Sequence, residues 1–142
     1  MHPFAPIVLT ALLFLSLIPQ SAHAQSTTPR DYRGSYTCIQ GRTELDLKIL
    51  PNPSHPNHPQ AIFTFWPPHI GSAQHPEGAF LMHGTLNPLL GTLNLRPTRW
   101  IKQPPLFAMV AMTGTSNDGG AIFTGTINYP ACTHFSLRLQ AP

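Results

Sequence analysis

The sequence predicts an all-β fold in which about eight antiparallel strands follow one another in a meander. Three observations lead to this class. Short apolar or alternating segments recur with turn residues between them, almost no stretch keeps a helical period, and the two cysteines, Cys38 and Cys132, lie far apart. A meander leaves two unpaired edges unless it closes, so we expect an up-and-down barrel, with a flattened sandwich as the alternative.

The expected strands have turn signals between them. They cover residues 34–40, 43–50, 61–66, 79–86, 91–96, 106–113, 121–128 and 133–140. The second is the clearest, because apolar residues from Leu45 to Ile49 alternate with charged ones from Glu44 to Lys48. The Asp118-Gly119 step predicts a tight hairpin with Gly119 at positive φ.

The first residues read as an export signal. Residues 7–18 form an apolar run too short to span a bilayer, followed by Pro19 and the small-x-small pattern Ala22-His23-Ala24. We expect a signal peptide over residues 1–24, a linker over 25–33 and one β domain over 34–142, with an uncleaved anchor as the alternative. No later stretch has the length and apolarity of a membrane helix. The protein is then secreted or periplasmic.

Export places Cys38 and Cys132 in an oxidising compartment, where two thiols normally pair. If the strands alternate in direction, the first ends and the eighth begins at the same end of the barrel. The two cysteines become cross-strand neighbours when those strands pair, so we expect one disulfide.

The charge balance is mild. Eight Lys and Arg face five Asp and Glu, a net charge of +3, and the basic residues form no dense cluster. The absence of a dense basic cluster disfavours a nucleic-acid binder. The small positive surplus favours anionic partners at the cell envelope.

A resemblance rests on the run Gly34-Ser35-Tyr36-Thr37-Cys38-Ile39-Gln40-Gly41-Arg42-Thr43-Glu44-Leu45-Asp46-Leu47, on Trp100 between Pro97 and Pro104, and on Cys132 with Phe135 and Leu137. This pattern resembles a small β-domain at the C-terminal ends of some exported or multidomain bacterial proteins. That resemblance implies a structural framework and brings no catalytic residue. In architecture the expected barrel is also similar to the small periplasmic lysozyme inhibitors, whose inhibitory loop signature is absent from this sequence.

The sequence offers little catalytic chemistry. It contains no G-x-S-x-G, and its five acids are scattered over strands and turns. We expect no enzyme and no cofactor, and a small hydrolase ranks third among the functions considered.

Histidines give the second hypothesis, a protein that handles Cu(II) or Zn(II). His55, His58, His69 and His75 lie in two Pro-rich loops. In a meander these loops join successive strands and lie at opposite ends of the barrel, so only His55 and His58 remain as a loose pair.

The first hypothesis is an exported, non-enzymatic binding module for a cell-envelope protein or glycan. Counting strand directions brings His69 and five candidate binding residues to the rim at the disulfide end. The five candidates are Arg42, Arg99, Trp100, Lys102 and Tyr129. Aromatic residues and Arg are the types that dominate interface hot spots. Trp100 has a structural alternative, as a plug in the barrel mouth.

Overall fold

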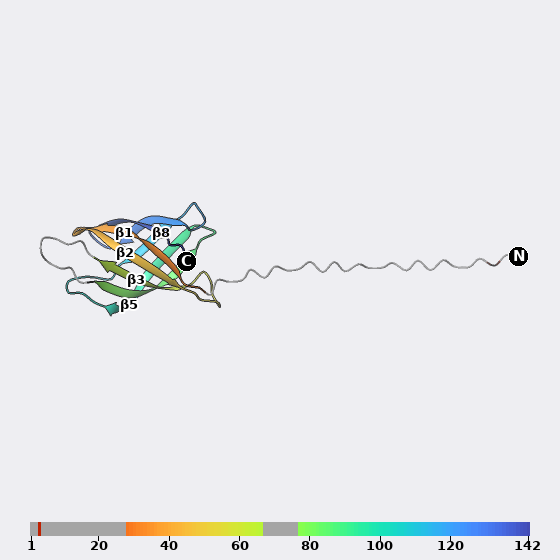
Figure 1. Ribbon diagram of the computed structural model, residues 1–142, viewed down its shortest axis with the longest axis horizontal. Coiled ribbons are helices and arrows are strands. Elements are labelled where there is room, and N and C mark those ends of the chain that lie inside the picture. The colour runs from red at the N-terminus through yellow and green to blue at the C-terminus, as the bar shows by residue number, and fades with distance from the viewer. Residues whose placement is uncertain (1–2, 4–27, 67–76) are drawn as a thin grey trace.

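The computed structural model describes Pro3, residues 28–66 and residues 77–142. Eight antiparallel strands form one closed barrel in sequence order (Figure 1): β1 (Arg30–Cys38), β2 (Gly41–Leu50), β3 (Gln60–Trp66), β4 (Gly78–Asn87), β5 (Thr92–Lys102), β6 (Ala111–Thr115), β7 (Ile122–Asn128) and β8 (Cys132–Leu139). This architecture confirms the predicted all-β meander. Within the described ranges, no helix is long and apolar enough to cross a membrane. Apart from Pro3, the predicted signal peptide lies outside the described residues.

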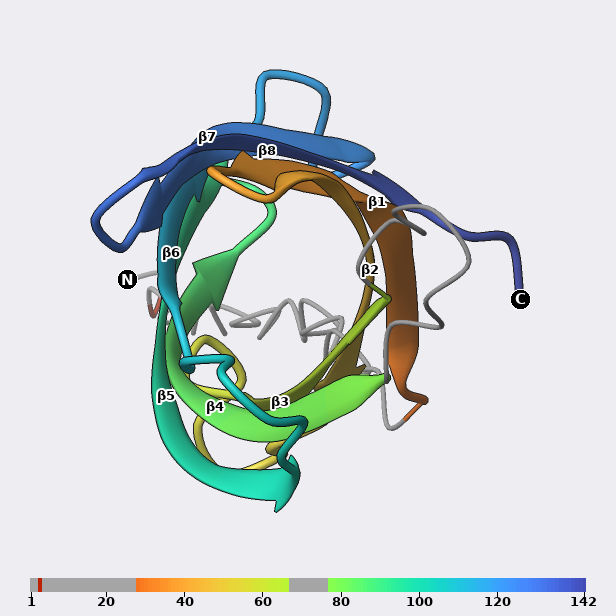
Figure 2. The same ribbon diagram turned by 90° about the vertical axis from the view of Figure 1, so that its left-hand side faces the viewer.

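The barrel closes where β1 pairs with β8. Figure 2 looks along the barrel and shows these two strands side by side. Cys38 lies opposite Cys132 in their register and forms a disulfide with it. Both the closed barrel and the disulfide were predicted, and the sandwich alternative is excluded.

β1 begins earlier than expected. It starts at Arg30, so residues 30–33, assigned above to the linker, belong to the barrel. The reason is Tyr32, which is buried in the core and donates a hydrogen bond of 2.7 Å from its hydroxyl to the carbonyl of Gly120. The sequence alone does not reveal that long-range contact.

β5 and β6 differ most from the prediction. β5 runs through Pro97 to Lys102, and β6 starts only at Ala111. Consequently β6 pairs with residues from Thr92 to Leu95 alone, and the rest of β5 has β4 as its neighbour. Proline is tolerated in a strand that has a free edge, which explains why Pro97 does not end β5.

Side chains fill the barrel interior. The largest of the fully buried ones, Tyr32, Phe63, Phe65, Phe80 and Phe123, are each less than 2 % exposed. The rings of Phe63 and Phe80 stack with centroids 4.6 Å apart. A small barrel filled in this way has a packed core in place of an internal ligand chamber.

The hairpin between β6 and β7 is built as predicted. Gly119 has a φ of 72° and Gly120 a φ of 87°. The Asp118 carboxylate accepts hydrogen bonds from the Ser116 hydroxyl at 2.6 Å and from the amide of Ile122 at 3.0 Å. These hydrogen bonds hold the pKa of Asp118 below its usual value, and the bond from the Ser116 hydroxyl has the largest effect.

Candidate binding surface at the disulfide end

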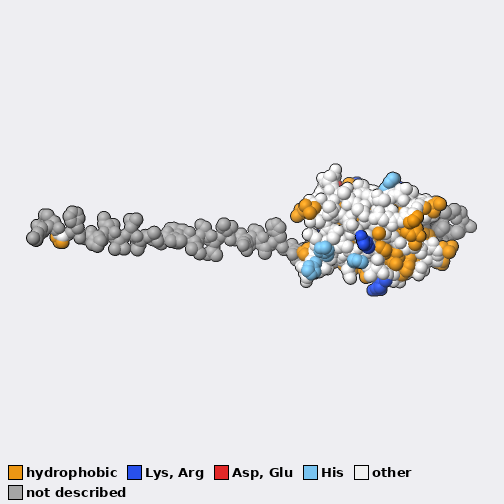
Figure 3. Space-filling view, turned by 180° about the vertical axis from the view of Figure 1, so that it is seen from behind, with side chains coloured by type: hydrophobic (Ala, Val, Ile, Leu, Met, Phe, Trp, Pro, Cys, Tyr) orange, Lys and Arg blue, Asp and Glu red, His pale blue; other side chains and the backbone are white. Residues whose placement is uncertain are grey.

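The disulfide end of the barrel carries an exposed apolar surface. Ile39 is 87 % exposed, Leu106 is 105 % exposed and Tyr129 is 45 % exposed. They line a hollow of about 540 Å³, which we call the apolar mouth; its lining includes Ile39, Leu106, Phe107, Tyr129 and Ala131. In Figure 3 hydrophobic side chains gather at this end, towards the right of the view. Large aliphatic side chains left in water in one patch are typical of an interaction surface.

Three chain segments build the mouth. The turn after β1 presents Ile39, the connection from β5 to β6 presents Leu106, and the turn before β8 presents Tyr129. Phe107 anchors the middle segment, because its ring packs against Phe65 with centroids 5.4 Å apart. Cys38 and Cys132 also line the hollow, so their disulfide fixes two of the three segments to each other.

The backbone of the mouth is strained at two points. Leu106 has a φ of 65° and Ala131 a φ of 68°, and these are the non-glycine residues with positive φ in the described chain. Such a conformation costs roughly 1–2 kcal/mol for a residue with a Cβ. The side chain of Leu106 points into solvent, so its strained backbone is not compensated by packing of that side chain. Strain without a gain in packing is a feature that concentrates at functional sites.

Among the described residues that line the mouth there is no carboxylate and no imidazole. Tyr36 is the titratable group in the lining besides Tyr129. Burial raises the pKa of the Tyr36 hydroxyl well above its usual range, so the phenol stays neutral.

Of the five predicted binding residues, Tyr129 alone lines the mouth. Arg42 lies on β2 and forms an ion pair of 3.2 Å with Glu44. Arg99, Trp100 and Lys102 lie on β5. Two strands separate β2 from β5, a distance of about 14 Å along the wall at ordinary strand spacing. The predicted rim residues therefore share one end of the barrel without forming one cluster.

Trp100 is half-buried. Its ring lies 5.4 Å from that of Phe80 and 6.3 Å from that of Phe65, measured between centroids. This packing against the core fits the structural role that the sequence left open for it.

The main residues of the mouth were not predicted as binding residues. Leu106 and Phe107 fall in the expected strand over residues 106–113, and no binding role is predicted for them from the sequence. The available signal was Pro104-Pro105 directly before them, because two consecutive prolines disfavour a paired strand start.

The histidine pair lies in the loop between β2 and β3. Both side chains are exposed, and the amide of His58 donates to the carbonyl of His55 at 2.9 Å. The Asn52 side chain braces this turn by donating to the carbonyl of His58 at 3.0 Å. No group of three His, Cys, Asp or Glu side chains with metal-binding spacing occurs among residues 28–66 and 77–142. His69 and His75 lie outside the described residues.

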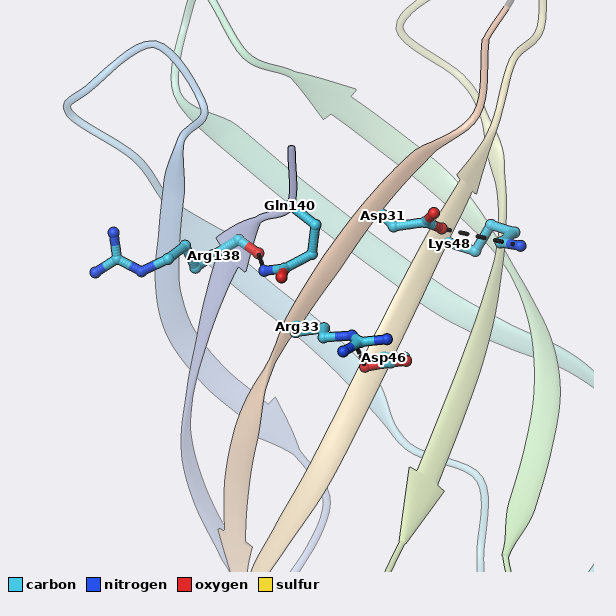
Figure 4. A network of polar contacts seen from close by, with 6 residues as sticks. All are labelled: Asp31, Arg33, Asp46, Lys48, Arg138 and Gln140. Carbon is cyan, nitrogen blue, oxygen red and sulfur yellow. Dashed lines mark hydrogen bonds and ion pairs between the residues drawn. The ribbon is translucent and has the colours of Figure 1, made fainter. Parts of the chain in front are cut away.

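A polar groove of about 590 Å³ lies on the outer wall. Arg33 and Asp46 pair at 3.3 Å, and Lys48 and Asp31 pair at 4.0 Å, across β1 and β2 (Figure 4). Partial burial raises the pKa of Asp46 and the Arg33 guanidinium opposes that shift. Because these pairs are largely exposed, they contribute little to stability.

By its fold, the protein is a small closed antiparallel β-barrel with one disulfide between its first and last strands. Comparison of the chain with protein-family models, with curated proteins and with solved structures finds no match.

Proposed function

We propose that this protein is an exported, non-enzymatic binding module that captures a cell-envelope protein with its apolar mouth. The observation that carries the proposal is the exposed Leu106, held in a strained backbone beside Ile39 and Tyr129. Exposing such residues costs free energy in water, and a partner that covers them recovers it.

Export rests on the leader sequence and agrees with the disulfide. A bridge between Cys38 and Cys132 persists in an oxidising compartment. A protein partner is favoured over a glycan because Ile39 and Leu106 are aliphatic, whereas sugars are usually held by aromatic rings and polar groups.

The test uses a matched pair of substitutions. Leu106→Asp places a charge in the mouth, and Leu89→Asp makes the same change on the turn between β4 and β5, where Leu89 is 92 % exposed at the opposite end of the barrel. The oxidised protein and both variants are immobilised and exposed to envelope extract, and the captured proteins are quantified by mass spectrometry.

We expect one partner to be captured by the native protein and by Leu89→Asp, and to be lost with Leu106→Asp. Both variants should keep the native melting temperature, because both side chains are exposed. Equal capture by the two variants would contradict the proposal. Capture that disappears after glycosidase treatment of the extract would instead assign the surface to a glycan.

A further inference from the structure

Within the described part of the chain, the second half of β5 has a free edge in an otherwise closed barrel. β6 pairs with residues Thr92 to Leu95, and from Arg96 to Lys102 the ladder contains β4 alone. No backbone hydrogen bond joins this segment to any other described strand or loop. In Figure 2 the arrowhead of β5 lies outside β4 and away from β6. Among residues 28–66 and 77–142, the backbone groups on that side of β5 have no partner strand.

The side chains of this segment are largely exposed to solvent. Buried and exposed residues alternate regularly along β5 up to Arg96, and the alternation then stops. Arg99 and Lys102 are exposed, and Ile101 is 52 % exposed. The alternation stops where the β4–β5 register shifts, and the side chains around both shifts are open to water.

Two bulges place the three cations of this edge on one face. The β4–β5 register opposes Arg96 to His83, Arg99 to Leu81 and Lys102 to Ala79. These β4 residues alternate with Met82 and Phe80, which are buried in the core. The register shifts between Leu81 and Met82 and between Ala79 and Phe80 insert Thr98 and Ile101 as extra residues. Without those extra residues, Arg99 would point away from the face that Arg96 and Lys102 share.

The three cations have no acidic partner in the chain. All five acids, Asp31, Glu44, Asp46, Glu77 and Asp118, lie in the described residues. The ion pairs they form engage Arg33, Arg42 and Lys48, none of which lies on β5. A row of cations that form no ion pair with a carboxylate of the chain, beside a free strand edge, is complementary to an extended acidic chain.

We propose that the edge Arg96–Lys102 binds an extended acidic segment of a partner protein, which adds to the sheet as a further strand. Backbone hydrogen bonds along the edge would supply affinity. Acidic side chains at every second position of the segment would meet the three cations, because side chains on one face of a strand recur at period two. This site is separate from the apolar mouth and does not depend on it.

A second copy of the chain fits the edge poorly. If two β5 edges paired antiparallel along their full length, Arg96 would oppose Lys102 of the second copy and Arg99 would oppose Arg99 of that copy. Like charges directly opposite each other destabilise a strand pair. The acidic segment is therefore the occupant that the charges favour.

The test measures binding of labelled peptides to the oxidised protein by fluorescence anisotropy. The first peptide alternates Glu and Thr, the second has the same composition with all Glu residues at one end, and the third is the alternating peptide N-methylated at every second residue. We expect the alternating peptide to bind and added salt to weaken it. The block peptide should bind more weakly, and N-methylation on the amides that face β5 should abolish binding.

Two charge reversals complete the test. Arg99→Glu should lower the affinity about tenfold, whereas Arg138→Glu should leave it unchanged, because Arg138 is an exposed cation on β8, which has a neighbour on each side. Equal losses in the two variants, or unchanged binding of the methylated peptide, would overturn the proposal. The methylated peptide needs no variant, so a folding defect does not affect that result. Sedimentation should give a monomer, and a dimer that Arg99→Glu dissociates would assign the edge to a second copy.

Discussion

Removing the disulfide should cost about as much stability as truncating one of the fully buried phenylalanines. Cys38 and Cys132 are separated by 94 residues, so the bridge closes a loop that includes most of the domain. In the chain-entropy model, closing a loop of that length lowers the conformational entropy of the unfolded state. This raises the free energy of unfolding by about 4.7 kcal/mol. For a domain of this size the loss corresponds to a decrease in Tm of about 20 °C.

The assay is urea unfolding of the native protein and of the double variant Cys38→Ala/Cys132→Ala, each with and without reductant. Reductant should bring the native protein close to the double variant and leave the variant unchanged. Alanine is the replacement of choice because Cys38 is buried and a hydroxyl there would add a second cost. A loss below about 1 kcal/mol would refute the reasoning, because the unfolded chain would then be constrained by something other than the bridge.

Three further predictions concern single residues. Gly119→Val should destabilise the protein by about 1–2 kcal/mol in thermal melts and Gly119→Asn by less, because the backbone there has positive φ and no atom lies within 4 Å of an added Cβ. Trp100→Ala should cost about 2 kcal/mol in urea unfolding, roughly half the value for a fully buried aromatic, and an unchanged midpoint would show that its ring contacts contribute nothing. The hydrogen bonds to the Asp118 carboxylate should stabilise the fold above its ordinary pKa of 3.8 and be lost as the pH falls through its lowered pKa. Melts of Asp118→Asn should therefore vary less with pH below 3.8 than native melts do; identical pH profiles would contradict this assignment.

The strands and turns were predictable because alternation and turn residues are local features of the sequence. Alternation from Glu44 to Ile49 identified β2, and the Asp118-Gly119 step identified a hairpin. Barrel closure followed from strand count and from the positions of Cys38 and Cys132, which need no knowledge of packing.

The candidate surfaces were predicted only in part. Counting strand directions gives the end of the barrel at which a residue lies, but it does not give the position around the wall. Arg42 and Arg99 were therefore placed together although two strands separate them. The extension of β5 beyond Pro97 was missed because proline normally ends a paired strand, and only the late start of β6 at Ala111 makes that position tolerable. The bulges at Thr98 and Ile101 depend on register, which the sequence does not specify at those positions.

The pairing of the first strand with the last affects how this barrel reaches its native state. β8 is the last of the eight barrel strands in chain order. Until it pairs with β1, both strands expose long edges on which other chains can add and aggregate. Contacts between such distant segments also make folding slow. A chain oxidised before it folds already has Cys38 and Cys132 tied together, so the search for the closing strand pair is much shorter. The timing of oxidation would then set the refolding rate and the fraction of chains lost to aggregates, as well as the final stability.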